Sequence, residues 1–119
     1  MKIFKSKQSS WIDRAGYSKK ILATPEQLAI PGILVQQIRI APGQVAKNHY
    51  HKKQTEIFYF LNTVGTFSIN NKPIDLEVGD VLVVEPNDLH EVSNEGVEDF
   101  LYIAFKHNWE ENDYFETES

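Results

Sequence analysis

Four side chains in the middle of the chain have the types and the spacing of a single metal site. His49 and His51 are two residues apart, so both imidazoles project from the same face if this segment is an extended strand. Glu56 follows five residues later, which leaves room for a turn that returns its carboxylate to the two imidazoles. His90, in a later segment, is the candidate for a fourth ligand. Three histidines and one glutamate therefore form the candidate metal site.

Nitrogen and oxygen are the available donors, because the chain has no cysteine. Three neutral imidazoles and a carboxylate suit Fe, Mn, Ni, Cu, Co or Zn, so we expect one divalent transition metal per chain. Four protein donors around a six-coordinate ion leave two positions for water or substrate. Two alternatives stay open. The histidines could be ordinary strand and turn residues, which their joint spacing disfavours, or the site could bind a ligand without turnover.

Length and composition are those of one soluble domain. The 119 residues contain 41% hydrophobic and 24% charged residues. The longest apolar runs are too short to span a bilayer, and the first ten residues lack the apolar core of a signal peptide. We therefore expect a soluble, cytoplasmic protein that does not associate with membranes.

The charges are unevenly distributed between the two ends of the chain. Residues 110–119 carry five acidic and no basic residues, which accounts for the whole net charge of −5. Residues 1–20 are basic, but the rest of the chain offers no matching basic face, so we expect no nucleic acid partner. Opposite charges at the two ends could pair within a chain or across a dimer, but solvated termini are the expected arrangement. The predicted organisation is an N-terminal arm over 1–32 with a strand and short helix that pack on the barrel, a barrel over 33–107 and an acidic tail over 108–119.

Between the ends, short segments rich in Val, Ile, Phe and Tyr alternate with turn-forming residues. This pattern predicts a sandwich or a barrel. The predicted strands are 33–40, 55–61, 65–69, 80–84, 91–93 and 100–105, with turns that include 70–73. One short helix is expected after Thr24, where Pro25 and Glu26 follow a capping residue, and Pro31 and Gly32 should close it.

Residues 33–105 resemble the cupin family. The first cupin motif is matched by Gly43, His49, His51 and Glu56, and the second by Gly79, His90 and Asn94. Two turn positions depart from the family pattern: Thr63 replaces the last glycine of the first motif, with Gly65 two positions on, and Glu85-Pro86-Asn87 replaces Pro-x-Gly. The resemblance implies an all-β, double-stranded β-helix (jelly roll) that holds the metal at one end of the barrel. We expect the departures to alter the loops at its mouth and to leave the metal site intact.

Strand alternation identifies candidate residues for the wall of the cavity. If Glu56 points inward, Phe58 and Phe60 do so too, although plain core packing explains inward aromatics equally well. Val92 shares the face of His90, and apolar content places Gln36 inside rather than Arg39. By the same parity Lys47 lies on the face of His49 and His51. It is the one cation with an argument for proximity to the metal, although a solvated lysine at the start of the strand is the more ordinary interpretation.

The sequence leaves the reaction open, and no catalytic residue is identified. An apolar aromatic pocket favours a dioxygenase-like enzyme that binds a small chelating substrate and O₂. A sugar-phosphate isomerase-like enzyme is the alternative, but it needs cationic or hydroxyl groups, which Lys47 alone supports weakly unless Arg39 and Thr66 face inward. A non-catalytic module that binds or senses a small ligand also remains open, and a purely structural role for the metal ranks last. We expect a homodimer, in which residues 1–17 could cross to cover an edge of the neighbouring sheet.

Overall fold

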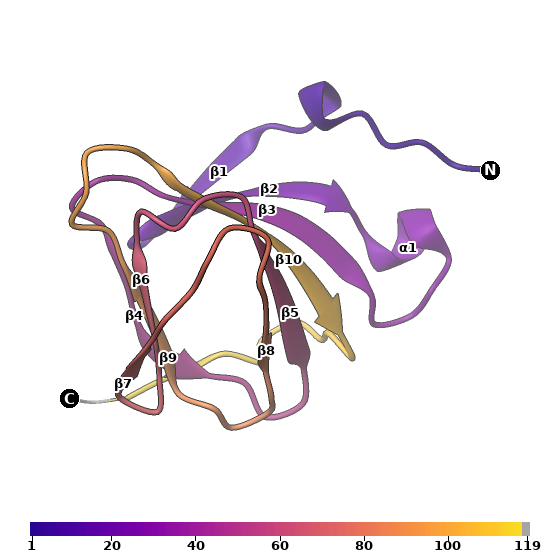
Figure 1. The fold of residues 1–119 in the computed structure, drawn as a ribbon. Helices are drawn as coiled ribbons and strands as arrows, with labels where there is room; N and C mark the ends of the chain where they lie inside the picture. The colour runs from indigo at the N-terminus through magenta and orange to yellow at the C-terminus, as the bar shows by residue number, and fades with distance from the viewer. Residues whose placement is uncertain (118–119) are drawn as a thin grey trace.

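The protein folds as two antiparallel β-sheets that enclose one core; the computed structural model describes residues 1–117 (Figure 1). The six-stranded sheet has the order β1 (Trp11–Arg14), β2 (Tyr17–Ala23), β3 (Leu34–Ile40), β10 (Phe100–His107), β5 (Thr55–Phe60) and β8 (Val81–Val84). The five-stranded sheet has the order β11 (Phe115–Glu116), β4 (Val45–Tyr50), β9 (His90–Ser93), β6 (Thr66–Ile69) and β7 (Lys72–Ile74). A 3-10 turn, η1 (Ser6–Gln8), and one short helix, α1 (Pro25–Leu28), complete the described part. The predicted jelly roll is confirmed.

Aromatic side chains fill the space between the sheets. Phe58, Phe60, Phe100 and Tyr102 of the six-stranded sheet meet Phe67 of the other sheet, with ring centroids 5.2 to 6.4 Å apart. Tilted and edge-to-face pairs at such distances add about 1 kcal/mol each beyond the burial of apolar area. The inner face of each strand therefore rests on a well-packed core, which holds the strands that carry the candidate ligands in a defined register.

The predicted strands are present, with differences at their ends. β10 continues to His107, two residues beyond the prediction, and brings Lys106 into the sheet. Asn70 and Asn71, with φ of 51° and 67°, form the turn alone, so Lys72 begins β7 rather than completing the turn. Two successive residues with positive φ make the tight hairpin connection whose twist matches the strands.

The short helix begins as predicted and ends earlier. Thr24 and Gln27 form a reciprocal capping box, in which each side chain bonds the backbone N–H of the other, and Pro25 occupies the first helical position. Ala29, with φ of 57°, ends the helix in the left-handed region, two residues before Pro31. None of the described helices is long and apolar enough to cross a membrane.

The N-terminal arm is part of the sheet rather than a loose extension. β2 pairs with β3, and β1 pairs with β2 of the same chain. Residues 11–23 thus form two strands of the sheet, where the sequence predicted one strand in an arm that packs on the barrel. β1 is an edge strand of the six-stranded sheet and lies on the outside of the barrel (Figure 1). Exchange of this arm between subunits stays a prediction.

Gly16, in the turn between β1 and β2, is required by both conformation and space. Its φ is +82°, and a Cβ atom there would lie 1.9 Å from the carbonyl oxygen of Val45. We expect Gly16→Ala to lower the free energy of unfolding by at least about 2 kcal/mol in urea denaturation, because the clash is with backbone. Gly43→Ala is the matched control: φ is +83°, but a Cβ would meet nothing within 4 Å, so a loss of only about 1 kcal/mol is expected. Equal losses in the two variants would contradict the steric argument.

Two motif positions have structural rather than chemical roles. The buried Asn94 amide donates to the carbonyl oxygens of Ile40 and Glu98, and its carbonyl oxygen accepts from the Gly96 N–H, so it ties together the loops at one end of the barrel. At Gly65 an added Cβ would lie 2.2 Å from the Phe100 ring. The glycine that is displaced by two positions from the family pattern is therefore needed for close packing.

Candidate metal centre

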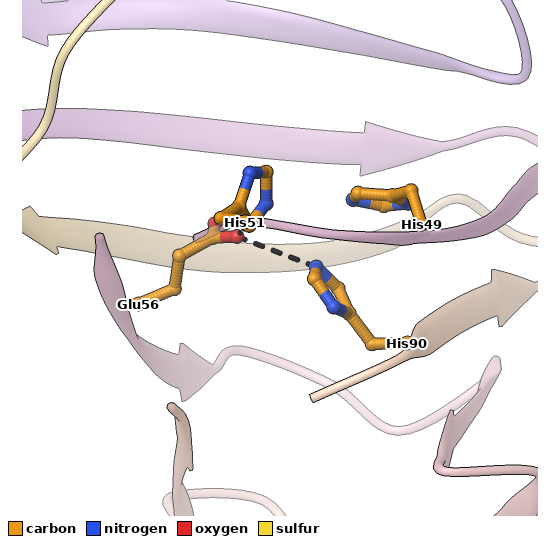
Figure 2. Close-up of side chains that lie close together, drawn as sticks. All are labelled: His49, His51, Glu56 and His90. Atoms are coloured by element: carbon orange, nitrogen blue, oxygen red, sulfur yellow. Dashed lines mark ion pairs between the residues drawn. The ribbon is translucent and has the colours of Figure 1, made fainter. Parts of the chain in front are cut away.

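Four side chains converge between the two sheets. His49 lies on β4, His51 just beyond its end, Glu56 on β5 and His90 at the start of β9, and all four point toward one another (Figure 2). Their ligand atoms all lie within 4.8 Å of one another. His51, Glu56 and His90 are buried, and His49 is half-buried. The proximity predicted from the spacing is confirmed.

A bulge in β4 decides which side chains of this strand face the site. Ala46 pairs with Val92 and His49 pairs with His90, so β4 uses one more residue than β9 over the same length. Both Ala46 and His49 consequently face inward, and the regular alternation of inward and outward side chains is broken between them. Lys47 is exposed and lines a separate surface hollow with Val45 and Glu116. The placement of Lys47 beside the metal is therefore corrected, because it assumed regular alternation along β4.

Backbone carbonyl groups set the orientation of each imidazole. The Nδ1 atom of His49 lies 2.7 Å from the carbonyl oxygen of Lys47, and that of His90 lies 3.0 Å from the carbonyl oxygen of Asp88. The Nδ1 of His51 bonds to the carbonyl oxygen of Asp113. A carbonyl oxygen can only accept, so each Nδ1 carries the proton, and each neutral ring presents the lone pair of Nε2. Such outer hydrogen bonds are the usual way to orient a metal-binding histidine.

The inward atoms fit a metal ion. The Nε2 atoms of His51 and His90 lie 2.7 Å and 3.3 Å from Oε1 of Glu56. Both are buried, and neither has a hydrogen-bond partner in the described part of the chain. Two nitrogen lone pairs that face a carboxylate oxygen repel it in the absence of a positive charge. One cation among these donors satisfies all of them, and the set of three imidazoles and one carboxylate suits a transition metal.

The electrostatic environment keeps the donors in the forms that bind metals. Burial raises the pKa of Glu56, but the positive charge of Lys106 lowers it, and the pKa lies well below its usual value. Burial and the proximity of His90 lower the pKa of His49 to about 4. At neutral pH the carboxylate is therefore ionised and His49 is neutral, as ligation requires.

The acidic tail holds two of the candidate ligands. The carboxylate of Asp113 accepts the backbone N–H groups of Lys52, Lys53 and Gln54 at 2.8 to 3.0 Å, in the turn that follows His51. The Tyr114 ring stacks on His49, with centroids 4.7 Å apart and planes at 23°. β11 then pairs with β4, so the segment crosses from the six-stranded to the five-stranded sheet (yellow in Figure 1). The expectation of a loose acidic tail is wrong as far as residue 117; residues 118 and 119 lie outside the described part.

The cluster opens into a small cavity of about 70 Å³. Gln36, Phe58 and Val92 line it, as predicted. Phe60 does not: it is completely buried in the core and stacks on Phe100. The distinction arises because Phe60 lies four residues beyond Glu56, deeper in the barrel.

Four polar side chains that line the cavity were not predicted from the sequence: Tyr17, Tyr102, Lys106 and Tyr114. Lys106 pairs with Glu56 across β10 and β5, and it lies on the same inner face of β10 as Tyr102. Extending the predicted strand by two residues would have revealed it. Tyr17 and Tyr114 had no local signal, because they reach the cavity from the N-terminal arm and the C-terminal tail.

The fold and the site together define a small β-barrel protein with a candidate metal centre. The Cupin domain family (Cupin_2) matches residues 36–106, more than half of the chain, and the protein belongs to this family. An oxalate-binding protein of Thermotoga maritima is 30% identical over 71 residues, which are 60% of this chain and 59% of that protein. The tetracenomycin polyketide synthase protein TcmJ of Streptomyces glaucescens is 26% identical over 83 residues, 70% of this chain and 56% of that protein. The chain thus matches less than two thirds of the length of these curated relatives.

Solved structures share the fold at low sequence identity. KdgF from Halomonas sp. has a TM-score of 0.78 at 19% identity, with 94% of this chain and 97% of that chain covered. A predicted oxalate decarboxylase from Thermotoga maritima has a TM-score of 0.74 at 23% identity, with 89% and 98% covered. Pac13, described as a nucleoside dehydratase, has a TM-score of 0.75 at 14% identity, with 98% and 94% covered. At these identities the likeness establishes the fold alone.

Proposed function

We propose that His49, His51, Glu56 and His90 bind one divalent transition metal, and that the protein is a metal-dependent enzyme for a small anionic molecule that chelates this metal. The observation that carries the proposal is the convergence of imidazole Nε2 atoms and an ionised carboxylate, with each Nδ1 hydrogen-bonded to a backbone carbonyl. The cluster adjoins a cavity, so a ligand has access to it.

Polar groups on the cavity wall favour proton-transfer chemistry. The bound metal would polarise a carbonyl or carboxylate oxygen of the substrate. Burial raises the pKa of Tyr17, and burial and the charge of Glu56 raise the pKa of Tyr102, so both phenols stay protonated and can donate hydrogen bonds. Lys106 adds a positive charge next to Glu56 that attracts an anion. These groups suit an isomerisation, elimination or decarboxylation better than the apolar pocket that we expected from the sequence. An oxalate-binding relative is consistent with a small anionic ligand.

A dioxygenase-like reaction is the second candidate. Ile38, Phe58, Phe67 and Val92 form an apolar part of the cavity wall, which suits O₂ and a substrate radical or peroxide better than a phosphate group. A non-catalytic module is a further candidate, and it would bind the small ligand without converting it to a product.

Metal content and isotope exchange separate these functions. We expect close to one transition metal per purified chain by elemental analysis, and metal-dependent exchange of the α-proton of a small keto or hydroxy acid in D₂O, followed by proton NMR. The protein stripped with a chelator is the control. O₂ uptake in step with substrate loss would contradict the proton-transfer function and support the dioxygenase-like function. Tight binding without either change would leave a binding module, and failure to bind any of the six metals would overturn the whole proposal.

We also propose a homodimer and a cytoplasmic location. β8 is an edge strand on which Val81 and Val83 are 58% and 49% exposed, and pairing with a second copy would cover this edge. Light scattering coupled to gel filtration measures the oligomeric state directly. A monomer at micromolar concentration would contradict the dimer.

A further inference from the structure

A second, larger hollow lies outside the cavity. It has a volume of about 510 Å³ and shares Tyr17, His51, Lys106 and Tyr114 with the cavity wall, so the two spaces adjoin at these four side chains. We call it the vestibule; its other walls come from β1, β2 and the C-terminal segment. The cavity itself, at about 70 Å³, is smaller than typical small-molecule sites. We take the vestibule as the outer part of a ligand site that begins at the metal cluster, because four side chains border both spaces and its volume is typical of small-molecule sites.

Three cations stand along one wall of the vestibule: Arg14, Lys19 and Lys106. Lys19 pairs with Ile38, which pairs in turn with Tyr102, so it lies on the inner face of the sheet. Burial lowers the pKa of Lys19, and the charges of Lys106 and Arg14 lower it further, which indicates that the three cations are close enough to repel one another. Within residues 1–117 none of the three forms an ion pair with a carboxylate.

The acids on the opposite wall do not neutralise this cluster. Glu110 forms an ion pair with Lys53 at 2.8 Å, and the carboxylate of Asp113 accepts three backbone N–H groups. Glu111 is the remaining acidic residue of the wall. Lys106 lies beside Glu56, so Arg14 and Lys19 are the two cations of the wall that remain, against Glu111 as the remaining acid, and the vestibule attracts anions.

A buried amide lies beside the cations. Gln54 lines the vestibule and is 2% exposed, and its Nε2 has no hydrogen-bond partner in the described part of the chain. A buried donor without a partner costs about 1 to 3 kcal/mol, so such groups call for an explanation.

We propose that Arg14, Lys19, Lys106 and Gln54 form an anion subsite, which binds a second anionic group of a substrate whose other end binds at the metal cluster. This inference rests on the proposed function for the position of the first group. The substrate class is a small organic molecule with two separated anionic groups, of which the outer one is a carboxylate or a phosphate. Arginine and lysine bind both groups through charge-assisted hydrogen bonds.

Calorimetric titration of the metal-loaded protein tests the subsite. The probes are acetate, the dicarboxylates from oxalate to glutarate, and phosphoglycolate, so that the outer group is absent, a carboxylate or a phosphate. We expect at least one two-anion probe to bind tenfold or more tightly than acetate. Lys19→Met and Arg14→Leu should each reduce this advantage at least fivefold. Lys106 is left intact, because it also lies beside Glu56.

Lys20→Met is the matched control. Lys20 neighbours Lys19 in sequence, but its ammonium lies 5.3 Å from the centroid of the Trp11 ring and does not line the vestibule. This variant should bind every probe as the wild type does. Equal binding of acetate and all two-anion probes, or equal losses in Lys20→Met and Lys19→Met, would overturn the subsite. Thermal melts of each variant separate loss of binding from loss of folding.

A metal-free arm separates this inference from the proposed function. Inorganic phosphate titrated into the chelator-stripped protein should bind weakly, and Lys19→Met should weaken it at least fivefold further. Phosphate binding with this dependence, in a protein that binds no metal, would support the anion subsite and refute the metal function. Metal binding without any effect of Lys19→Met on phosphate or two-anion probes would do the reverse.

Discussion

Replacing His51 with alanine is expected to lower the affinity for the metal by more than about 100-fold, because one of four donors is lost and losses in the outer shell alone cost about 10- to 100-fold. The same change removes the hydrogen bond from Nδ1 to the carbonyl of Asp113, so the tail loses one of its attachments to the site. Competition with a chromophoric chelator measures the affinity. The wild type should also gain about 2.7 kcal/mol of stability at a metal concentration of 100 Kd, and the variant little of it at the same concentration.

His107→Ala is the control for this experiment. His107 is exposed, ends β10 and lies outside the cluster, so its loss should change neither affinity nor stoichiometry. Unchanged stoichiometry in His51→Ala would show that the four-donor assignment is wrong. Circular dichroism of the metal-free proteins checks that the His51→Ala variant is folded, so a loss of metal binding can be distinguished from a loss of folding.

Replacing Asp113 with alanine is expected to destabilise the protein by about 3 kcal/mol. The carboxylate accepts three backbone N–H groups, and a hydrogen bond to a charged group contributes about 1.5 to 3 kcal/mol. The expected loss of stability lies well below the summed contribution of three such hydrogen bonds, because water reaches the exposed part of the turn. For a chain of this length the loss corresponds to a fall in Tm of roughly 10 °C. The metal affinity should fall about tenfold, since the turn and the tail no longer hold His51 and Tyr114.

Glu111→Gln is the control for the tail. Glu111 is exposed, two residues from Asp113, and no hydrogen bond or ion pair of its side chain occurs within residues 1–117. Its replacement should leave Tm within about 1 °C of the wild type. A similar fall in Tm in the two variants would mean that general acidity of the tail, rather than the contacts of Asp113, stabilises the protein.

The carboxylate of Asp113 also predicts an acid dependence. Burial raises its pKa, but the three N–H groups lower it by more, so the pKa in the folded protein lies below its usual value. A group with a depressed folded pKa contributes stability that is present above its unfolded pKa of about 3.9 and is lost as pH falls through the folded pKa. The difference in unfolding free energy between the wild type and Asp113→Asn should therefore shrink below about pH 4. A constant difference down to pH 2 would contradict this assignment.

The local sequence pattern was sufficient to predict most strands, but not to predict on which face of the sheet each side chain lies. The alternation of β3 and β5 correctly placed Gln36 and Phe58 inward, because those strands are regular over their whole length. The same rule failed at Lys47, since one extra residue in β4 reverses the parity. A bulge depends on the register with the partner strand, and β4 by itself carries no sign of it.

The amino-acid sequence by itself determined the candidate ligands, since histidine and glutamate at these spacings have few other uses. The pattern of its strands indicated a sandwich or a barrel, and the resemblance to the cupin motifs implied the jelly roll. Only the tertiary structure decided what surrounds the cluster. Lys106, Tyr17 and Tyr114 come from β10, β2 and the C-terminal segment, which are distant in sequence. Their convergence follows from strand pairing and from the contacts of Asp113 with the turn after His51. These are long-range interactions, and no local periodicity encodes them.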